Sequence, residues 1–470
     1  MPGANEHVDV AVLGGGPGGY VAALSAAQRG ARVLLVEKAR LGGTCLNVGC
    51  IPTKALATSA ELLLRARHAH DFGLAIPQVA VDLPALMTYK AATVDKLVGG
   101  VEQLLKGRKV AVIRGEARLL RPGTLLVTDE TGTSREVTAT HLILAPGSLP
   151  TTPPIDGIDL PGVLTSTQAL DLDAVPQRLV VVGGGVIGLE FACIYEALGS
   201  QVTVLEMAAT VLSEATDEVV AKRLQLLLQR RGMVIHTGTT VKRIVRTGGT
   251  LAVHASGPSG DSILEGDRVL VATGRRPNTD GMGFTEAGLR MNGRAIWVDA
   301  RMATSLPNVW AIGDAVGGWM LAHKAMVEGR VVAENVTGGQ RSVDYRSVPN
   351  VIFTRPEAAS VGLTEAQARA TEAKVKVSQF PFSANPRARI LGEPDGFVRL
   401  VCEAGTGRVL GVHLLGPHVT DLIAEGALAV QLGATADDLA WTTHAHPTLP
   451  EAMLEAALGF RDAAIHMQSR

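Results

Sequence analysis

A glycine pattern that occurs twice restricts the fold of this chain more than any other feature of its sequence. The first copy lies in VDVAVLGGGPGGYVAALSAAQRGARVLLVEK and the second in QRLVVVGGGVIGLEFACIYEALGSQVTVLEM. The matching positions are Gly14 and Gly183, Gly16 and Gly185, Gly19 and Gly188, Gly30 and Gly199, and Glu37 and Glu206, each pair 169 residues apart. Chance rarely gives so constant an offset. We therefore expect one βαβ unit to be present twice.

Each copy has the elements that a dinucleotide-binding turn needs. The first reads as a strand from Val8 to Leu13, an alanine-rich helix ended by Gly30, and a strand ending at Glu37. A lone G-x-G-x-x-G can be a plain glycine turn, but here a strand, a helix and a terminal acid accompany it. The first glycine makes the tight turn, the second admits a pyrophosphate and the third lets the helix pack on the strand. The N-terminus of the helix then binds the phosphates.

The two terminal acids suggest which nucleotides bind. Glu37 and Glu206 would each accept hydrogen bonds from ribose hydroxyls. A carboxylate at Glu206 would repel a 2′-phosphate, so the second unit favours NAD over NADP.

Composition excludes several other classes of function. At 470 residues the chain should hold about three domains. Its 44 basic and 45 acidic residues nearly cancel, which argues against nucleic acid or an anionic membrane as partner. The start, MPGANEHVDV, lacks the features of a signal peptide, and no run reaches the roughly 18 apolar residues of a membrane helix. We expect a soluble, cytoplasmic protein.

The stretch LGGTCLNVGCIPTKAL places two cysteines in a glycine-bracketed loop. Cys45 and Cys50 could form a structural disulfide, a metal site or a redox pair. A large chain in a reducing compartment needs no structural disulfide, so any disulfide here is expected to be catalytic. Cys193 and Cys402, the remaining cysteines, are interpreted as small buried hydrophobic residues.

The remaining segments indicate how the units are joined. Residues 141–162 and 268–284 each read as a strand that runs into a turn-rich crossing, typical of a domain boundary. Residues 301–336 read as a strand with Gly313 and Asp314 at its tip, followed by a helix. We expect this segment to return to the first domain, with Asp314 facing the cofactor; the alternative is an aspartate that only caps a helix. From residue 348 alternating strands predict an α+β domain with an antiparallel sheet.

Taken together, these motifs resemble those of a known family. The chain is similar to the pyridine nucleotide–disulphide oxidoreductases and, among them, to the dihydrolipoamide dehydrogenase subfamily. The resemblance rests on GGTCLNVGCIPTKAL, VVVGGGVIGLEF, ATGRRPNT, AIGDA, LAHKA, ANPRARILGEPDGFVRLV and HAHPTLPEAMLEAA, in the family's order. It implies an α/β fold with two Rossmann-like, three-layer dinucleotide-binding domains and a C-terminal α+β dimerisation domain. The implied segments are 1–152 and 277–347 for FAD, 153–276 for NAD and 348–470 for dimerisation.

The resemblance also implies a reaction. It is the oxidation of protein-bound dihydrolipoyl groups through a Cys45–Cys50 disulfide and FAD to NAD+, in a homodimer. The enzyme would serve a 2-oxoacid dehydrogenase or glycine cleavage complex and would meet lipoyl domains of an acyltransferase subunit. Cys50 would be the sulfur beside the flavin and Cys45 the one that exchanges with substrate. FAD belongs to the first unit because the cysteine pair begins only eight residues after Glu37.

Further roles follow from position and from the family's pattern. IPTKAL reads as a helix start with Pro52 in the first turn, so the helix dipole would lower the thiol pKa of Cys50. Lys54, on the same helix face, matches the family's lysine beside the flavin ring, and Glu190 matches its acidic partner. Gly274, Gly313 and Asp314 are the other expected cofactor contacts.

A dithiol substrate must also lose protons. The stretch THAHPTLPE supplies His446 with a carboxylate, Glu451, and proline residues that stiffen the turn between them. By resemblance this pair acts on the disulfide of the partner subunit. His444 is interpreted as structural, and a metal site is not expected because no further ligands accompany the pair.

Related enzymes and a different class of protein are the alternatives. Glutathione reductase would carry an NADP site where LEMAATVL stands. Mercuric reductase and large thioredoxin reductases carry a further redox pair near the C-terminus, and a soluble transhydrogenase lacks one active cysteine. A non-catalytic subunit that only holds FAD would have no reason to keep Cys45, Cys50, His446 and Glu451 together. Pro146, Met326 and Pro450 depart from the family's usual residues, and we expect them to alter rate or affinity rather than the reaction.

Overall fold

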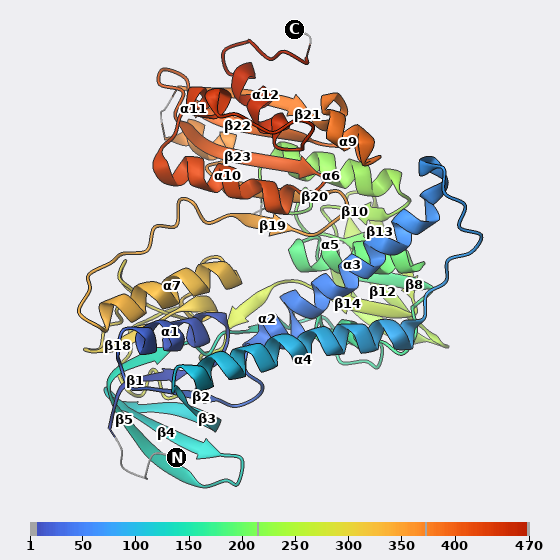
Figure 1. Ribbon diagram of the computed structural model, residues 1–470. Helices are drawn as coiled ribbons and strands as arrows, with labels where there is room; N and C mark the ends of the chain where they lie inside the picture. Colours follow the sequence, from blue (N-terminus) through green and yellow to red (C-terminus); the bar gives the residue numbers. More distant parts are fainter. Residues whose placement is uncertain (1–6, 214–215, 372–373, 468–470) are drawn as a thin grey trace. The chain divides into compact units, whose positions relative to one another are not determined.

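The computed structural model describes residues 7–213, 216–371 and 374–467, which form two compact units (Figure 1). Unit 1 comprises residues 1–56, 84–151 and 274–343, and unit 2 comprises residues 57–83, 152–273 and 344–470. The opening residues 1–6, part of the stretch in which no signal peptide is predicted, lie outside the described ranges. The finer division at residues 152, 276 and 347 stays a prediction.

A five-stranded parallel sheet forms the centre of unit 1. Pairing follows the order β3, β2, β1, β5, β18, and β4 joins β3 and β5 in an antiparallel layer. The strands are β1 (Val8–Leu13), β2 (Val33–Glu37), β3 (Ala111–Arg121), β4 (Thr124–Asp129), β5 (Ser134–Leu144) and β18 (Val309–Ala311). Most of β1 and all of β2 are buried, as their unbroken apolar sequences VDVAVL and VLLVE predict for strands covered on both faces.

Helices pack closely on this sheet. α1 (Pro17–Gln28) and α7 (Ala322–Asn335) lie side by side (Figure 1). A Cβ on Gly329 would lie 2.6 Å from Gly18 O, so the approach of the two helices depends on glycine. The other helical elements of unit 1 are α2 (Gly43–Val48), the start of α3 (Cys50–Arg67), α4 (Leu83–Gly107) and η3 (Gly313–Val316). Short strand pairs complete the unit: β6 (Ser148–Pro150) with β15 (Arg275–Pro277), and β16 (Met291–Asn292) with β17 (Ala295–Ile296).

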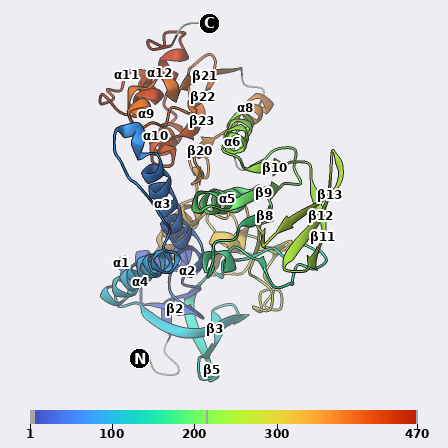
Figure 2. The same ribbon diagram turned by 90° about the vertical axis from the view of Figure 1, so that its right-hand side faces the viewer.

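Unit 2 contains the second parallel sheet, in the order β10, β9, β8, β14, β7. Its strands are β7 (Val163–Leu164), β8 (Arg178–Val182), β9 (Gln201–Leu205), β10 (Val234–His236) and β14 (Arg268–Val271). α5 (Val186–Leu198) follows β8, and α6 (Glu218–Arg230) follows β9 (Figure 2). An antiparallel sheet is made by β11 (Thr240–Thr247), β12 (Thr250–Gly257) and β13 (Gly260–Gly266).

The C-terminal part of unit 2 is an antiparallel sheet with helices. Its order is β19 (Asn350–Ile352), β20 (Glu357–Gly362), β23 (Val409–Gly416), β22 (Phe397–Glu403) and β21 (Val375–Pro381). The helices of this part are α8 (Glu365–Ala370), η4 (Phe382–Ala384), α9 (Pro386–Ile390), α10 (Val419–Leu432), α11 (Ala436–Trp441) and α12 (Glu451–Gly459). Two short helices, η1 (Ala69–Phe72) and η2 (Gln168–Leu170), belong to earlier segments of unit 2. Phe380, Phe382 and Phe460 anchor one buried core.

The predicted fold class is confirmed in both repeats and in the C-terminal α+β part. The cysteine stretch differs from the expected loop, because α2 carries Cys45 and ends one residue before Gly49. A Cβ on Gly49 would lie 2.8 Å from Thr44 O, so this glycine lets α2 turn directly into α3. Among the described residues, no helix combines the length and the apolar character needed to cross a membrane.

Candidate active site

The glycines of the first turn perform two different tasks. A Cβ on Gly19 would lie 1.9 Å from Gly14 O, and a Cβ on Gly14 would lie 2.2 Å from Ala145 O. Gly14 also has φ of +98°, a region that favours glycine. At Gly16 the nearest atom to a Cβ would be Gly43 Cα, at 3.9 Å. The fold itself therefore requires Gly14 and Gly19, whereas Gly16 leaves open backbone at the start of α1, as a pyrophosphate needs.

The second turn repeats this division. A Cβ on Gly188 would lie 2.0 Å from Gly183 O, and Gly183 has φ of +110°. A Cβ on Gly185 would meet no atom within 4 Å among the described residues. Both turns thus present backbone that a phosphate can approach at the N-terminus of a long helix. The predicted equivalence of the two copies extends from sequence to geometry.

The terminal acids of the two copies make matching hydrogen bonds. Glu37 accepts from Gly15 N at 2.7 Å through Oε2 and from Ala39 N at 2.8 Å through Oε1. The second-copy acid, Glu206, accepts from the N–H groups two residues after it and within its own glycine turn, at 2.7 and 2.6 Å. An ionised carboxylate offers about four acceptor positions, so each acid can still receive ribose hydroxyls. The bonds to the turns were not predicted.

Cys45 and Cys50 lie together as thiols, Cys45 on α2 and Cys50 as the first residue of α3. A hydrogen bond between the two side chains raises the pKa of Cys45, and burial and the negative charge of Cys50 raise it further. The positive charge of Lys54 acts in the opposite direction. Cys45 therefore keeps its proton, and Cys50 lies at the helix N-terminus, where the dipole favours an anion. The prediction that Cys50 begins a helix is confirmed.

Asp314 lies in η3, just after β18, and two residues that the sequence did not reveal orient its carboxylate, Ser148 directly and Arg275 through Ser148. Ser148 Oγ donates to Asp314 Oδ2 at 2.5 Å. Arg275 in turn donates from Nε to Ser148 Oγ and from Nη2 to Ser148 O, both at 2.8 Å. Burial lowers the pKa of Arg275, while the charges of Asp314 and Cys50 oppose this effect. Leu321, not Asp314, is the N-cap of α7, so the alternative of a simple helix cap there is not observed.

The other predicted cofactor contacts are placed as follows. Gly274 has φ of +115°, and its carbonyl oxygen accepts from Thr151 N at 2.9 Å. Gly313 has φ of +75° and begins η3. Glu190 is buried on α5 and accepts from Phe353 N at 3.0 Å. The pairing of Glu190 with Lys54 stays a prediction.

The predicted histidine and carboxylate are brought together. His446 Nδ1 lies 2.8 Å from Glu451 Oε1, and Thr448 N donates to Glu451 Oε2 at 2.7 Å. Burial alone would raise the pKa of Glu451, but the hydrogen bonds from Thr448 and His446 hold it below its usual value. The His446 side chain is 70% exposed, so a substrate can reach its other nitrogen. Pro450, the N-cap of α12, does not prevent Glu451 from reaching the histidine.

The three residues interpreted as structural, His444, Cys193 and Cys402, have buried side chains. His444 is 5% exposed and contacts Glu425 Oε1 at 2.9 Å and Thr442 O at 2.8 Å. Burial raises the pKa of Cys193 to about 11 and that of Cys402 to about 12. These thiols are therefore protonated near neutral pH.

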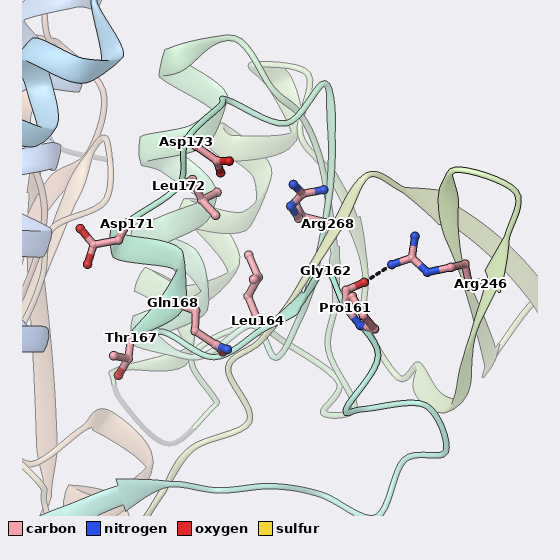
Figure 3. A pocket seen from close by; sticks show the side chains of 10 residues that line it. All are labelled: Pro161, Gly162, Leu164, Thr167, Gln168, Asp171, Leu172, Asp173, Arg246 and Arg268. Carbon is pink, nitrogen blue, oxygen red and sulfur yellow. Dashed lines mark hydrogen bonds between the residues drawn. The ribbon is translucent and has the colours of Figure 1, made fainter.

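An open hollow of about 610 Å³ lies at the β7 edge of the second parallel sheet (Figure 3). Asp173 and Arg268 point toward each other across it, and Arg246 donates to Pro161 O at its rim. The residues that line the hollow do not include any of the predicted site residues. Within the described ranges, no group of three or more His, Cys, Asp or Glu side chains could hold a metal ion.

Known proteins resemble the chain over nearly all of its length. Residues 8–329 match the pyridine nucleotide-disulphide oxidoreductase family, and residues 348–457 match the dimerisation domain of the same family. Dihydrolipoyl dehydrogenase of Thermus scotoductus is 45% identical, with 98% of this chain and 99% of the relative covered. Dihydrolipoyl dehydrogenase of Geobacillus stearothermophilus is 42% identical, with 98% of each chain covered.

Solved structures agree with this assignment. The crystal structure of LpdA from Mycobacterium tuberculosis superposes with a TM-score of 0.89 at 30% identity, covering 96% of this chain and 99% of the other. The HOCl-induced flavoprotein disulfide reductase RclA from Escherichia coli, as a Cu(II) complex, gives a TM-score of 0.86 at 30% identity with the same coverage. Two dinucleotide turns, a dithiol at a helix start and these matches lead to one conclusion. The chain belongs to the pyridine nucleotide-disulphide oxidoreductases.

Proposed function

We propose that the protein is a dihydrolipoyl dehydrogenase, which oxidises protein-bound dihydrolipoyl groups and reduces NAD+ with FAD as its resident cofactor. The observation that carries the proposal is the contact between Cys45 and Cys50 at the start of α3, where a raised pKa keeps the proton on Cys45. Curated relatives named dihydrolipoyl dehydrogenase, at 41–45% identity over nearly the full chain, support the substrate class.

The first chemical step uses only side chains of the protein, with His446 and the cysteine pair supplied by different subunits of the proposed homodimer. The ring nitrogen Nε2 of His446 takes a proton from one thiol of the substrate, because Nδ1 is engaged with Glu451. The resulting thiolate attacks the sulfur of Cys45 in the oxidised enzyme, and the Cys45–Cys50 bond breaks. Cys50 leaves as a thiolate, which the N-terminus of α3 stabilises.

The second thiol of the substrate then releases its proton to solvent and attacks the substrate sulfur that is bonded to Cys45. The bond to Cys45 breaks, the substrate leaves as a cyclic disulfide, and Cys45 takes the proton that His446 holds. The products are one substrate disulfide, one enzyme with a Cys45 thiol and a Cys50 thiolate, and one released proton, so atoms and electrons balance. Cys45 and Cys50 are free cysteines in the structure, as in this reduced product.

The two proposed nucleotide sites would allow the reduced cysteine pair to be reoxidised to the disulfide. When bound, FAD supplies a two-electron carrier between the dithiol and NAD+. The turn around Gly16, with Glu37, Lys54, Gly313 and Asp314, would hold FAD. The second turn, with Gly183, Gly185, Gly188 and Glu206, would hold NAD.

The proposal extends to partners. The match of residues 348–457 to the family's dimerisation domain supports a homodimer, in which His446 and Glu451 act on the disulfide of the other chain. Lipoyl domains of an acyltransferase subunit, in a 2-oxoacid dehydrogenase or glycine cleavage complex, are the proposed substrate carriers. The proposed location is the cytoplasm.

Turnover with defined substrates tests the proposal. Purified enzyme should reduce NAD+ with dihydrolipoamide and should oxidise NADH with lipoamide, and Cys45→Ser and Cys50→Ser should each abolish both reactions. Cys402→Ser is the matched control, because Cys402 is buried in the C-terminal core, and it should keep the activity. Turnover with glutathione disulfide or mercuric ion but not with lipoamide would contradict the substrate, and FAD binding without any turnover would indicate a non-catalytic subunit.

A further inference from the structure

A buried ion pair lies directly behind the Gly313–Asp314 turn of unit 1. Lys324 Nζ lies 3.0 Å from Glu328 Oε1, one helical turn apart on α7. The two side chains are 4% and 0% exposed. No role in the reaction proposed above uses either residue.

The ion pair binds both polar backbone groups of Gly313. Gly313 N donates to Glu328 Oε2 at 2.7 Å, and Lys324 Nζ donates to Gly313 O at 3.2 Å. Lys324 Nζ also donates to Gly317 O at 3.1 Å, at the other end of η3. The turn that carries Asp314 is therefore held at both ends by one pair of side chains.

A buried ion pair usually adds little to the folding stability of a protein. Removing two charges from water costs free energy that their attraction only partly returns, and a well-packed apolar pair is often as stable or more stable. What an apolar pair cannot do is donate to two carbonyl groups and accept from an N–H at fixed positions. The geometry of this pair is therefore better explained by the turn that it holds than by stabilisation of α7.

The carboxylate of Asp314 is oriented separately, by residues outside α7. Ser148 Oγ donates to Oδ2, and Arg275 holds Ser148 through its hydroxyl and its carbonyl oxygen. Oδ1 can accept a further hydrogen bond, since an ionised carboxylate has about four acceptor positions. The ion pair sets the position of the Asp314 backbone, and Ser148 sets the direction of its side chain.

We propose that Lys324 and Glu328 are positioning residues that hold Asp314 where it accepts a hydrogen bond from a hydroxyl group of FAD. This inference rests on the proposed FAD site. It goes beyond that site because it assigns a task to a buried pair that does not touch the cofactor.

The test compares holoenzyme variants in which the pair is replaced without leaving one charge alone. Lys324→Met with Glu328→Leu removes both charges together. Release of FAD on dilution, followed by the rise of free flavin fluorescence, should become at least tenfold faster, while the Tm of the protein stays within a few degrees. Glu218→Gln is the matched control, because Glu218 pairs with Lys222 at the same spacing on the exposed face of α6, and it should leave FAD release unchanged.

A double-mutant cycle with Asp314→Asn separates positioning from a merely structural effect. Asp314→Asn alone should accelerate FAD release by a similar factor. Adding the pair replacement to Asp314→Asn should then have little further effect, because the positioned group is already lost. The flavin absorption spectrum should shift in the same way in both variants.

Two outcomes would overturn the inference. One is an unchanged rate of FAD release in the pair variant. The other is a combined variant whose rate of FAD release rises by the product of the factors measured for the pair replacement and for Asp314→Asn separately. A loss of Tm with no change in FAD release would likewise show that the pair serves only stability. Failure of the proposed function is seen separately: a parent enzyme that binds FAD but does not oxidise dihydrolipoamide would refute the substrate and leave the positioning role intact.

Discussion

Replacing Glu451 by glutamine should lower activity because it removes one of the two hydrogen bonds that the carboxylate accepts in the structure. Both oxygens of Glu451 accept, Oε1 from His446 and Oε2 from Thr448, at 2.8 and 2.7 Å. Glutamine has a single oxygen, so one of these two N–H groups must face an amide NH₂ instead. A hydrogen bond to a charged group contributes about 1.5 to 3 kcal/mol.

The smaller value applies here because the His446 side chain is 70% exposed and solvent weakens the pair. About 1.5 kcal/mol corresponds to roughly a tenfold change in rate. The glutamine also withdraws the negative charge that favours a protonated His446 during proton transfer. We therefore expect kcat/KM for dihydrolipoamide to fall about 10- to 100-fold, with Tm nearly unchanged.

The dependence on pH gives a second measure of the same pair. The pKa of Glu451 is held below its usual value by its hydrogen bonds from Thr448 and His446, which outweigh the opposite effect of burial. The carboxylate is thus ionised throughout the neutral and mildly acidic range, and its contribution is lost only as pH falls through that lowered pKa. The advantage of the parent enzyme over Glu451→Gln should stay constant near neutrality and shrink in strong acid.

Glu425→Gln is the matched control. Glu425 contacts His444 at 2.9 Å, as Glu451 contacts His446 at 2.8 Å, but His444 is 5% exposed. This change should lower Tm and leave kcat/KM within about twofold. Steady-state NADH formation at several pH values, with Tm measured alongside, distinguishes the two variants. Equal kcat/KM for Glu451→Gln and the parent would refute the reasoning, as would an equal loss in both variants.

Two further predictions concern the second glycine turn and a buried histidine. Gly185→Ala should keep Tm and raise KM for NAD+, because its Cβ would meet no described atom within 4 Å, whereas Gly188→Ala should lower Tm, because its Cβ would lie 2.0 Å from Gly183 O. Binding of NAD+ that is unaffected by Gly185→Ala would argue against a pyrophosphate at this turn. Burial lowers the pKa of His413 in the folded protein, so the unfolded chain binds a proton at this histidine more readily. The free energy of unfolding should therefore fall as the pH drops below about 6.5, by at most about 1.4 kcal/mol per pH unit. His413→Gln should flatten the profile of Tm between pH 7 and 5, and an unchanged slope would exclude this histidine as the cause.

Local patterns explain why so much of the fold could be predicted. The strand from Val8 to Leu13 and the helix that ends before Gly30 depend on apolar runs and glycine positions close together in sequence. His446 and Glu451 are likewise only five residues apart, so their contact follows from the turn between them. Alternating apolar residues after residue 348 predicted an antiparallel sheet, and the structure has one of five strands there.

Contacts between distant segments could not be predicted in this way. Ser148 and Asp314 are 166 residues apart, and Ser148 and Arg275 are 127 residues apart, with no pattern that links them. Lys324 and Glu328 have the spacing of an ordinary surface ion pair, and only the packed structure reveals that they are buried. The short helix around Cys45 was also missed, because glycines at both ends indicate a loop.

The matching bonds of Glu37 and Glu206 to their glycine turns have a consequence for how nucleotides bind. Each acid accepts two backbone N–H hydrogen bonds, so the turn is held by bonds within the protein itself. A nucleotide then meets a site whose conformational entropy has been lost during folding rather than during binding. Substituting either acid should therefore loosen the turn as well as remove a ribose contact. The resulting loss of nucleotide affinity would report the lost order of the turn as well as the lost contact with the ribose hydroxyls.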